Sequence, residues 1–322
     1  MNVAIIGCGR MGQKRAAALG DDCIMWACDS DLAVAEKISQ AEYLNSDWRP
    51  CVADVDVEAV IVCTPHNMLA EIALAAVIEG KHVLIEKPGG IHCDDLTMVM
   101  AAAECSGSKV RVGYTLRYHR AVLKAREMVT DGDIGELMYV RGRYGHGGRP
   151  GMEKEWRCDP TQSGGGELID QGVHLIDLAR WFMGGEFKRK AYGVLTTFWP
   201  VPVEDNAFLL MGTDHEPQKG AFLHASWTEW KNLFSFEIFG TQGKIEISGL
   251  GGSYGPETLT HYAMSPQMGP PIQHTTVWHT PDDSFETEWQ EFVRDIREDR
   301  EPSPGISDAQ AVLRVVEQIY GK

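Results

Sequence analysis

The chain has too few basic residues to balance its acidic ones. Its 322 residues contain 30 Lys and Arg against 46 Asp and Glu, a formal net charge of −16 at pH 7. A protein that binds nucleic acid neutralises phosphates with a basic face, so this balance argues against a nucleic-acid partner. It also argues against docking on an anionic membrane. Long hydrophobic runs are missing too: none approaches the roughly 20 apolar residues that a membrane-spanning helix needs.

The N-terminus lacks the features of a secretory signal, and the cysteines lack the spacing of a zinc ribbon. No basic segment precedes the first apolar run, so we expect no secretory leader. The eight cysteines include no Cys-x-x-Cys pair, and we expect no metal site. Several lie inside apolar runs, where reduced thiols pack as small hydrophobic side chains. These features predict a cytoplasmic protein.

The first third of the chain alternates short apolar runs with helical patterns. We expect strands at 3–6, 24–28, 59–63, 82–85 and 110–113, and helices at 10–19, 32–39, 70–79 and 94–105. Repeated strand–helix units with near-continuous apolar strands predict an α/β fold with a parallel, doubly wound sheet. The length predicts about two domains, at ~150 residues per domain. We expect the first to span residues 1–116.

Beyond residue 116 the predicted strands follow one another with few helices between them. We expect strands at 137–144, 190–198, 207–211, 221–230, 234–238 and 244–247, and helices at 167–183, 285–298 and 307–320. Such a series predicts an α+β domain, residues 117–322, with a large open and mostly antiparallel sheet. We expect the C-terminal helix to be able to pack back on the first domain. Residues 249–255 read as a glycine-rich loop.

A glycine motif lies between the first predicted strand and helix. In Gly7-x-Gly9-x-x-Gly12, Gly7 makes the tight turn, Gly9 lets a pyrophosphate approach the backbone, and Gly12 lets helix and strand pack closely. The helix then begins with Arg10 and Met11. Its N-terminal turn supplies free N–H groups that can bind phosphates. The motif predicts a Rossmann domain that binds a dinucleotide. A glycine turn without a nucleotide is the alternative.

An acidic residue follows the second predicted strand. Asp29 lies where a carboxylate binds the ribose hydroxyls of the adenosine. With Asp31 it would repel the 2′-phosphate of NADP. The sequence therefore favours NAD over NADP.

Two further motifs carry side chains suited to acid–base chemistry. Lys87, in Glu86-Lys87-Pro88, follows a strand at the edge where ligands of such sheets bind, and the proline restricts its backbone. Asp170 and His174 are four residues apart, so on a helix they are neighbours. A carboxylate beside an imidazole suits general acid–base catalysis on an alcohol. The alternatives are a solvated lysine and an exposed ion pair; one Asp-x-x-x-His supplies too few ligands for a metal.

Four motifs together resemble those of the glucose–fructose oxidoreductase/inositol dehydrogenase/MocA family. They are residues 3–12, Cys63-Thr64-Pro65, residues 80–88 and residues 164–177, and they follow in order along essentially the whole chain. The resemblance implies a Rossmann domain joined to an α/β domain whose open sheet makes oligomer contacts, giving a homodimer or homotetramer. It implies oxidation of a secondary carbinol of a sugar, inositol or nucleotide-linked sugar with NAD(P).

The resemblance also implies site residues. The catalytic set is Lys87, Asp170 and His174, which also bind substrate. Cofactor contacts are implied for Thr64, Pro65, His66, Glu86, Lys87, Trp156 and Arg157, and substrate contacts for Tyr114 and Arg117. For Trp156 a core or interface position is the alternative. Members often carry a histidine where this chain has Leu69, so any role of that position is not inherited.

The substrate class stays open at this point. Basic side chains gather in one glycine-rich stretch, at Arg141, Arg143, His146, Arg149, Lys154 and Arg157. They indicate either recognition of a carboxylate or phosphate on a sugar derivative, or a solvated strand and loop. Reduction of a keto-sugar and a cofactor-binding regulator without turnover are the remaining alternatives.

Overall fold

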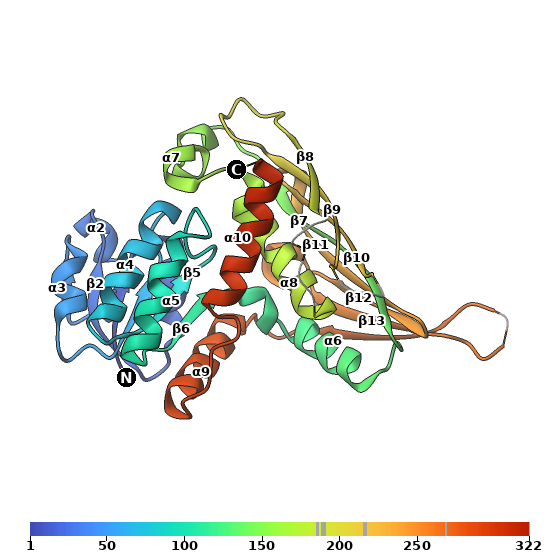
Figure 1. Ribbon diagram of the computed structural model, residues 1–322, viewed down its shortest axis with the longest axis horizontal. Helices are drawn as coiled ribbons and strands as arrows, with labels where there is room; N and C mark the ends of the chain where they lie inside the picture. The colour runs from blue at the N-terminus through green and yellow to red at the C-terminus, as the bar shows by residue number, and fades with distance from the viewer. Residues whose placement is uncertain (185–186, 188–190, 215–217, 268, 322) are drawn as a thin grey trace. The chain divides into compact units, whose positions relative to one another are not determined.

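The computed structural model describes residues 1–184, 187, 191–214, 218–267 and 269–321 (Figure 1). The chain forms two compact units. The first unit consists of Met1–Thr115, Thr161–Gly164 and Phe285–Leu313, and the second of Leu116–Pro160, Gly165–Ser284 and Arg314–Lys322. The boundary expected at residue 116, with 117–322 as one domain, stays a prediction.

The first unit is built on a six-stranded parallel sheet in the order β3-β2-β1-β4-β5-β6. The strands are β1 (Asn2–Ile6), β2 (Cys23–Cys28), β3 (Tyr43–Asn45), β4 (Ala59–Val62), β5 (His82–Glu86) and β6 (Val110–Gly113). The order reverses between β1 and β4, as in doubly wound dinucleotide-binding sheets, which bind their ligand at this point. The predicted α/β fold is confirmed.

Five helices connect these strands. They are α1 (Arg10–Ala17), α2 (Leu32–Ala35), α3 (Trp48–Ala53), α4 (His66–Ile78) and α5 (Asp95–Ser106). The expected helix 32–39 is wrong beyond residue 35, because the N–H groups of Lys37 and Ile38 bond three residues back and tighten the chain into turns. Neither the short β3 nor α3 was predicted, since both are too short to show a period.

Helix α9 (Ser284–Arg297) comes late in the chain but belongs to the core of the first unit. Its Trp289, Phe292 and Val293 share one buried cluster with Val3 and Ile5 of β1. These apolar side chains recur on one face of the helix, which explains why a segment so distant in sequence covers this sheet.

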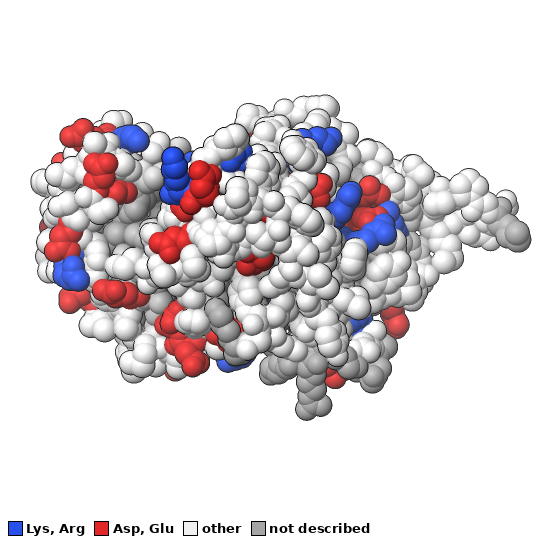
Figure 2. Space-filling view, turned by 90° about the horizontal axis from the view of Figure 1, so that it is seen from above, with Lys and Arg blue, Asp and Glu red and all other residues white. Residues whose placement is uncertain are grey.

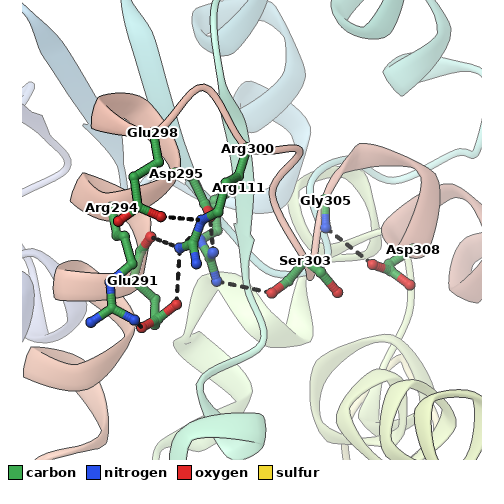
Figure 3. Close-up of polar contacts among 9 residues, drawn as sticks. All are labelled: Arg111, Glu291, Arg294, Asp295, Glu298, Arg300, Ser303, Gly305 and Asp308. Atoms are coloured by element: carbon green, nitrogen blue, oxygen red, sulfur yellow. Dashed lines mark hydrogen bonds and ion pairs between the residues drawn. The ribbon is translucent and has the colours of Figure 1, made fainter.

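Buried charges join α9 to the edge strand β6 (Figure 3). Arg111 of β6 is 2% exposed, pairs with Asp295 of α9, and donates to the carbonyl of Ser303 at 3.1 Å. Arg300 pairs with the same Asp295 at 2.8 Å and with Glu291 at 3.0 Å. Removing one partner of such a buried pair typically costs about 3–5 kcal/mol, so the contact holds α9 firmly on the sheet.

The second unit is built on an eight-stranded sheet in the order β14-β13-β12-β11-β7-β10-β9-β8. The strands are β7 (Leu137–Gly147), β8 (Ala191–Thr196), β9 (Asn206–Gly212), β10 (Gly220–Ser226), β11 (Thr228–Gly240), β12 (Gly243–Ser248), β13 (Glu257–Ala263) and β14 (Ile272–Trp278). The pairs are antiparallel except β7 with β10, so the predicted mostly antiparallel sheet is confirmed. Residue 190, where the predicted strand 190–198 begins, lies outside the described residues.

The strand predicted at 221–230 is wrong at its centre. It divides into β10 and β11 at Trp227, whose N–H leaves the ladder and donates to the carbonyl of Asp205 at 2.8 Å. The register of β11 against β7 is irregular between Thr228 and Leu233. Trp230 there has a positive φ of 60°. The strand predicted at 234–238 is the regular second half of β11.

Helices of the second unit lie on one side of its sheet (Figure 1). Helix α6 (Arg120–Asp131), which the sequence analysis missed, contacts β12 and β13, while α8 (Val173–Met183) contacts β7 and β10. The remaining helical segments of the described chain are η1 (Thr115–Tyr118), η2 (Met152–Lys154), η3 (Trp156–Cys158), α7 (Pro160–Ser163), the π-helix η4 (Leu168–Gly172), η5 (Gly252–Tyr254) and α10 (Ile306–Tyr320). Of these, η1, α7 and α10 each include residues of the first unit.

The acidic balance is visible on the surface. Figure 2 shows acidic side chains spread in small groups over one face, with basic side chains between them. The sequence between β13 and β14 contains no charged residue. Mixed charges of this kind form no continuous basic track on the face shown.

Candidate active site

The glycine turn after β1 has the steric pattern of a phosphate-binding loop. Gly7 has a φ of +90°, and a Cβ there would lie 2.6 Å from the carbonyl carbon of Cys63. A Cβ on Gly12 would lie 2.1 Å from the carbonyl oxygen of Gly7, so helix α1 and β1 pack too closely for any side chain. A Cβ on Gly9 would meet nothing within 4 Å. The loop is therefore closed on the protein side and open where a pyrophosphate would approach.

No described side chain of the protein caps the N-terminus of α1, so its N–H groups are available to a ligand. Gly9 is the N-cap, and no acidic residue lies in the first turn of the helix. The N-terminal end of a helix carries a partial positive charge and N–H groups without intrahelical partners. Arg10, at the first helical position, is exposed. These features fit the phosphates of a dinucleotide.

Asp29 lies just beyond the end of β2, as predicted. Its Oδ2 accepts from the N–H of Cys8 at 2.9 Å, and its Oδ1 accepts from the N–H of Asp31 at 3.1 Å. The carboxylate is thus held against the glycine turn by backbone donors, with part of its surface exposed. Its predicted contact with the ribose stays a prediction, and the geometry gives it a fixed position for that contact.

The segment after β4 contains a buried hydroxyl that a bound ligand could reach by a hydrogen bond. The hydroxyl of Thr64 is buried, and no described group hydrogen-bonds it. His66 begins α4 and is 4% exposed, with Nδ1 2.8 Å from the carbonyl of Ser163. Because a carbonyl only accepts, Nδ1 carries the proton. Leu69, at the position where the family often has histidine, is fully buried.

Glu86 is the last residue of β5 and Lys87 follows it. Arg15 of α1 binds the Glu86 carboxylate. This carboxylate lies 2.7 Å from a guanidinium nitrogen of Arg15, and Arg15 also contacts Glu288 at 2.6 Å. Burial lowers the pKa of Arg15, but Glu288 and Glu86 outweigh it and raise the pKa above its usual value. Glu86 therefore fixes the start of the Lys87 turn. Arg15 contacts Oε1 of Glu86, and the predicted cofactor contact of Glu86 stays a prediction.

In the second unit, Glu204 holds the start of the helical segment that carries Asp170 and His174. Its carboxylate accepts from the N–H groups of Gly166 and Leu168 at 3.1 Å and from the Tyr320 hydroxyl at 2.6 Å. A Cβ on Gly166 would lie 1.9 Å from the Glu204 carbonyl. Sequence reasoning missed Glu204, since it lies far from the motif and a cap of this kind leaves no local pattern.

The helix predicted at 167–183 has a different first turn. Leu168–Gly172 forms a π-helix, and α8 follows directly at Val173. The prediction of one α-helix is therefore wrong at this turn. Each hydrogen bond of a π-helix spans one residue more than in an α-helix, so the turn is wider. Single π turns recur at functional sites. Asp170 and His174 lie on either side of the junction and are 7% and 8% exposed.

Arg157 and Trp156 lie beside Asp170. The Nε of Arg157 is 3.2 Å from Oδ2 of Asp170, and its guanidinium lies 4.5 Å from the Trp156 ring centroid. The same two residues are predicted to contact the cofactor, which stays a prediction. The structure adds that Arg157 positions the carboxylate of Asp170, a pairing that the sequence analysis did not foresee.

The two predicted substrate residues of the segment after β6 are buried. Arg117 is 3% exposed and donates to both oxygens of Asp177, at 2.7 and 2.5 Å. Tyr114 is fully buried. The bidentate pair ties η1 to α8, which is a structural role. The substrate contacts predicted for Tyr114 and Arg117 stay predictions.

Half of the basic side chains in the stretch at 141–157 have acidic partners. Arg141 contacts Glu237 at 2.5 Å, Arg149 pairs with Glu155, and Arg157 pairs with Asp170. Three of its guanidinium groups are thus paired within the protein. This arrangement favours the solvated, ion-paired interpretation over an anion-binding patch.

Lys87 belongs to the first unit, and Asp170 and His174 belong to the second. Among the described residues, no group of three or more His, Cys, Asp or Glu could hold a metal ion. No described helix is long and apolar enough to cross a membrane. All eight cysteines are free thiols.

Two family models match the chain. Residues 1–114 match an oxidoreductase family described as having an NAD-binding Rossmann fold, and residues 122–246 match the GFO/IDH/MocA C-terminal domain. The chain belongs to the Gfo/Idh/MocA family. The resemblance inferred from the four motifs is confirmed.

Curated Gfo/Idh/MocA relatives include sugar and inositol dehydrogenases. Levoglucosan dehydrogenase of Pseudarthrobacter phenanthrenivorans is 30% identical over 230 residues, which are 66% of this chain and 58% of that protein. Inositol 2-dehydrogenase 2 of Saccharopolyspora erythraea is 29% identical over 199 residues, 58% of this chain and 55% of that protein. The matched part of the chain thus spans little more than half the length of these relatives.

Solved structures share the fold over the whole chain. An oxidoreductase domain protein from Kribbella flavida has a TM-score of 0.88 at 26% identity and covers 100% of this chain and 96% of its own. A levoglucosan dehydrogenase in complex with NADH also has a TM-score of 0.88, at 23% identity, covering 100% of this chain and 97% of its own. This Gfo/Idh/MocA chain therefore has the fold of those structures.

Proposed function

We propose that the protein is an NAD-dependent oxidoreductase that oxidises a secondary alcohol of a sugar or an inositol-like polyol. The observation that carries the proposal is a pair of buried titratable side chains, Asp170 and His174, on one helical segment of a chain that also has a dinucleotide turn. Curated relatives named as sugar and inositol dehydrogenases support it.

The proposed chemistry assigns separate tasks to the site residues. The substrate loses a hydride from the carbinol carbon and a proton from its hydroxyl, and the products are a ketone, NADH and H⁺. When bound, NAD supplies the nicotinamide ring that accepts the hydride. His174 accepts the hydroxyl proton, and Lys87 is the second proposed proton-transfer group. Asp170, held by Arg157, orients the imidazole. General-base assistance of this kind contributes about 10²–10⁴ in rate.

An uncharged substrate fits the charges of the second unit better than an anionic one. The guanidinium groups of Arg141, Arg149 and Arg157 already have carboxylate partners. A carboxylate or phosphate that bound one of these three guanidinium groups would compete with its acidic partner. We therefore propose a neutral sugar or polyol and set aside a nucleotide-linked sugar.

We also propose that the open face of the large sheet joins two or four copies of the chain. Tyr192 of β8, Leu210 of β9 and Phe222 of β10 lie side by side in the register and are 67%, 59% and 47% exposed. Exposed apolar patches of this kind mark interaction sites. A dimer or tetramer seen by light scattering supports this assembly, and a monomer at micromolar concentration contradicts it.

The free thiols fit the reducing cytoplasm, which we propose as the location.

The test is a screen for NAD reduction at 340 nm with inositols, aldoses, anhydrosugars and uronic acids. We expect activity with at least one neutral polyol or sugar. In a His174→Ala variant kcat should fall by about 10²–10⁴, while the Kd for NADH changes little because the glycine turn is intact. Uronic acids as the sole substrates would contradict the neutral class, and no signal from any compound would contradict the proposal.

A further inference from the structure

The glycine-rich loop at 249–255 has no part in the function proposed above, yet its shape is tightly specified. Gly249, Gly251, Gly252 and Gly255 all have positive φ, from 52° to 85°. A Cβ on Gly249 would lie 2.2 Å from the carbonyl oxygen of Pro256. The N–H of Gly251 donates to the carbonyl of Gly255 at 2.9 Å and closes the loop. The sequence therefore builds a defined loop here, and the short helix η5 within it carries Tyr254.

Tyr254 is the outer member of a row of rings that ends at His174. Its ring centroid lies 5.6 Å from that of Tyr144, a residue of β7. The Tyr144 ring lies 5.9 Å from the His174 ring in an edge-on arrangement, and 5.7 Å from Phe234 of β11. Tyr144 thus lies directly beside the proposed proton acceptor, and Tyr254 and Phe234 pack against Tyr144.

The hydroxyl groups of the two tyrosines are joined. The side chains of Tyr144 and Gln171 both interact with the Tyr254 hydroxyl. Burial raises the pKa of both tyrosines above its usual value, so both keep their protons at neutral pH. The Oε1 of Gln171, a residue of the π turn that is 8% exposed, has no hydrogen-bond partner among the described groups.

We propose that Tyr144 and Tyr254 form a substrate-binding wall that packs against the carbon face of a sugar or polyol ring and turns its reacting carbinol toward His174. The inference rests on the proposed function and names the residues that select the substrate. Aromatic side chains supply large apolar contact area with a polar group at one end, which suits a ring with a hydrocarbon face and hydroxyl edges. Tyr254 is half-buried, so part of its ring is accessible to such a ligand.

The matched variants are Tyr254→Ala, Tyr254→Phe and Ser253→Ala. Burial of an aromatic side chain is worth ~1.5–3 kcal/mol, and Tyr254→Ala removes most of the ring surface that a bound polyol would bury. The variant should therefore raise KM for the best polyol by roughly 10- to 100-fold. Tyr254→Phe keeps the ring and loses one neutral hydrogen bond, for a rise of about 2- to 10-fold. Ser253→Ala changes the adjacent residue, whose Oγ accepts from Asn232 at 2.6 Å, and should keep KM unchanged. The Kd for NADH should match the wild type in all three, while the thermal midpoint of Tyr254→Ala should fall because its ring packs against Tyr144.

Polyol binding to the enzyme–NADH complex, measured by calorimetry, separates this inference from the proposed function. If the wild type binds a polyol but reduces no NAD, the proposed reaction fails, and loss of binding in Tyr254→Ala still supports the wall. An unchanged KM and an unchanged polyol Kd in Tyr254→Ala would overturn the wall while leaving the reaction intact. A wild type that neither binds nor oxidises any polyol or sugar would overturn both.

Discussion

Gly9 and Gly12 allow a matched test of the nucleotide site, because one glycine faces open space and the other faces backbone. Gly9 has φ −63° and ψ −162°, a conformation that alanine adopts freely, and its Cβ would meet no protein atom within 4 Å. Replacing such a glycine by alanine usually stabilises a protein by about 0.4–1 kcal/mol through the unfolded state. We therefore expect Gly9→Ala to keep or slightly raise the thermal midpoint.

The same methyl group should weaken NADH binding strongly. It would occupy the space through which a pyrophosphate reaches the first N–H groups of α1. Loss of one hydrogen bond to a charged group costs about 1.5–3 kcal/mol, which raises Kd by roughly 10- to 150-fold. Gly12→Ala differs: its Cβ would lie 2.1 Å from the carbonyl oxygen of Gly7, so the midpoint itself should fall. NADH fluorescence titration and thermal unfolding measure both effects, and a wild-type Kd in a folded Gly9→Ala variant would refute the site.

Two further predictions concern single side chains. NAD should have a lower Kd than NADP, because Asp29 is held in place beside the glycine turn. Asp29→Ala should reduce the difference between the two Kd values by raising the Kd for NAD. Equal wild-type Kd values for the two cofactors in a fluorescence titration would contradict this. Burial and Glu204 raise the pKa of Tyr320 above its usual value of about 10, so its contribution to stability is complete below pH 10 and is lost as pH rises further. Tyr320→Phe should lower the midpoint at pH 7 but flatten its fall above pH 10, and an identical alkaline slope in the two proteins would count against the Glu204 contact.

The parts of the molecule that local sequence patterns predict are those held by neighbouring residues. The strand, glycine turn and helix from Asn2 to Ala17 need only contacts within one strand–helix unit, and the structure shows them close to the expected bounds. Asp29 at the end of β2 follows from the same short-range geometry. For these residues hydrophobic periodicity and turn chemistry contain nearly all the information.

The parts that were missed depend on residues far apart in the chain. The π turn at Leu168–Gly172 begins where Glu204 binds the backbone of Gly166 and Leu168, a contact without a local signal. Arg117 finds Asp177 60 positions away, and Arg15 finds Glu288 273 positions away. A helical wheel therefore places Asp170 beside His174, but it does not show that Arg157 binds Asp170.

Substrate labelled with deuterium at the carbinol carbon tests the central claim most directly. The account predicts that oxidation by the wild type transfers the label to the nicotinamide ring of NADH, because the hydride moves directly from carbon to the cofactor. Mass spectrometry of the isolated NADH should then show one added mass unit, with one face of the ring labelled. NADH formed without deuterium would contradict direct transfer and with it the oxidoreductase mechanism proposed for this chain.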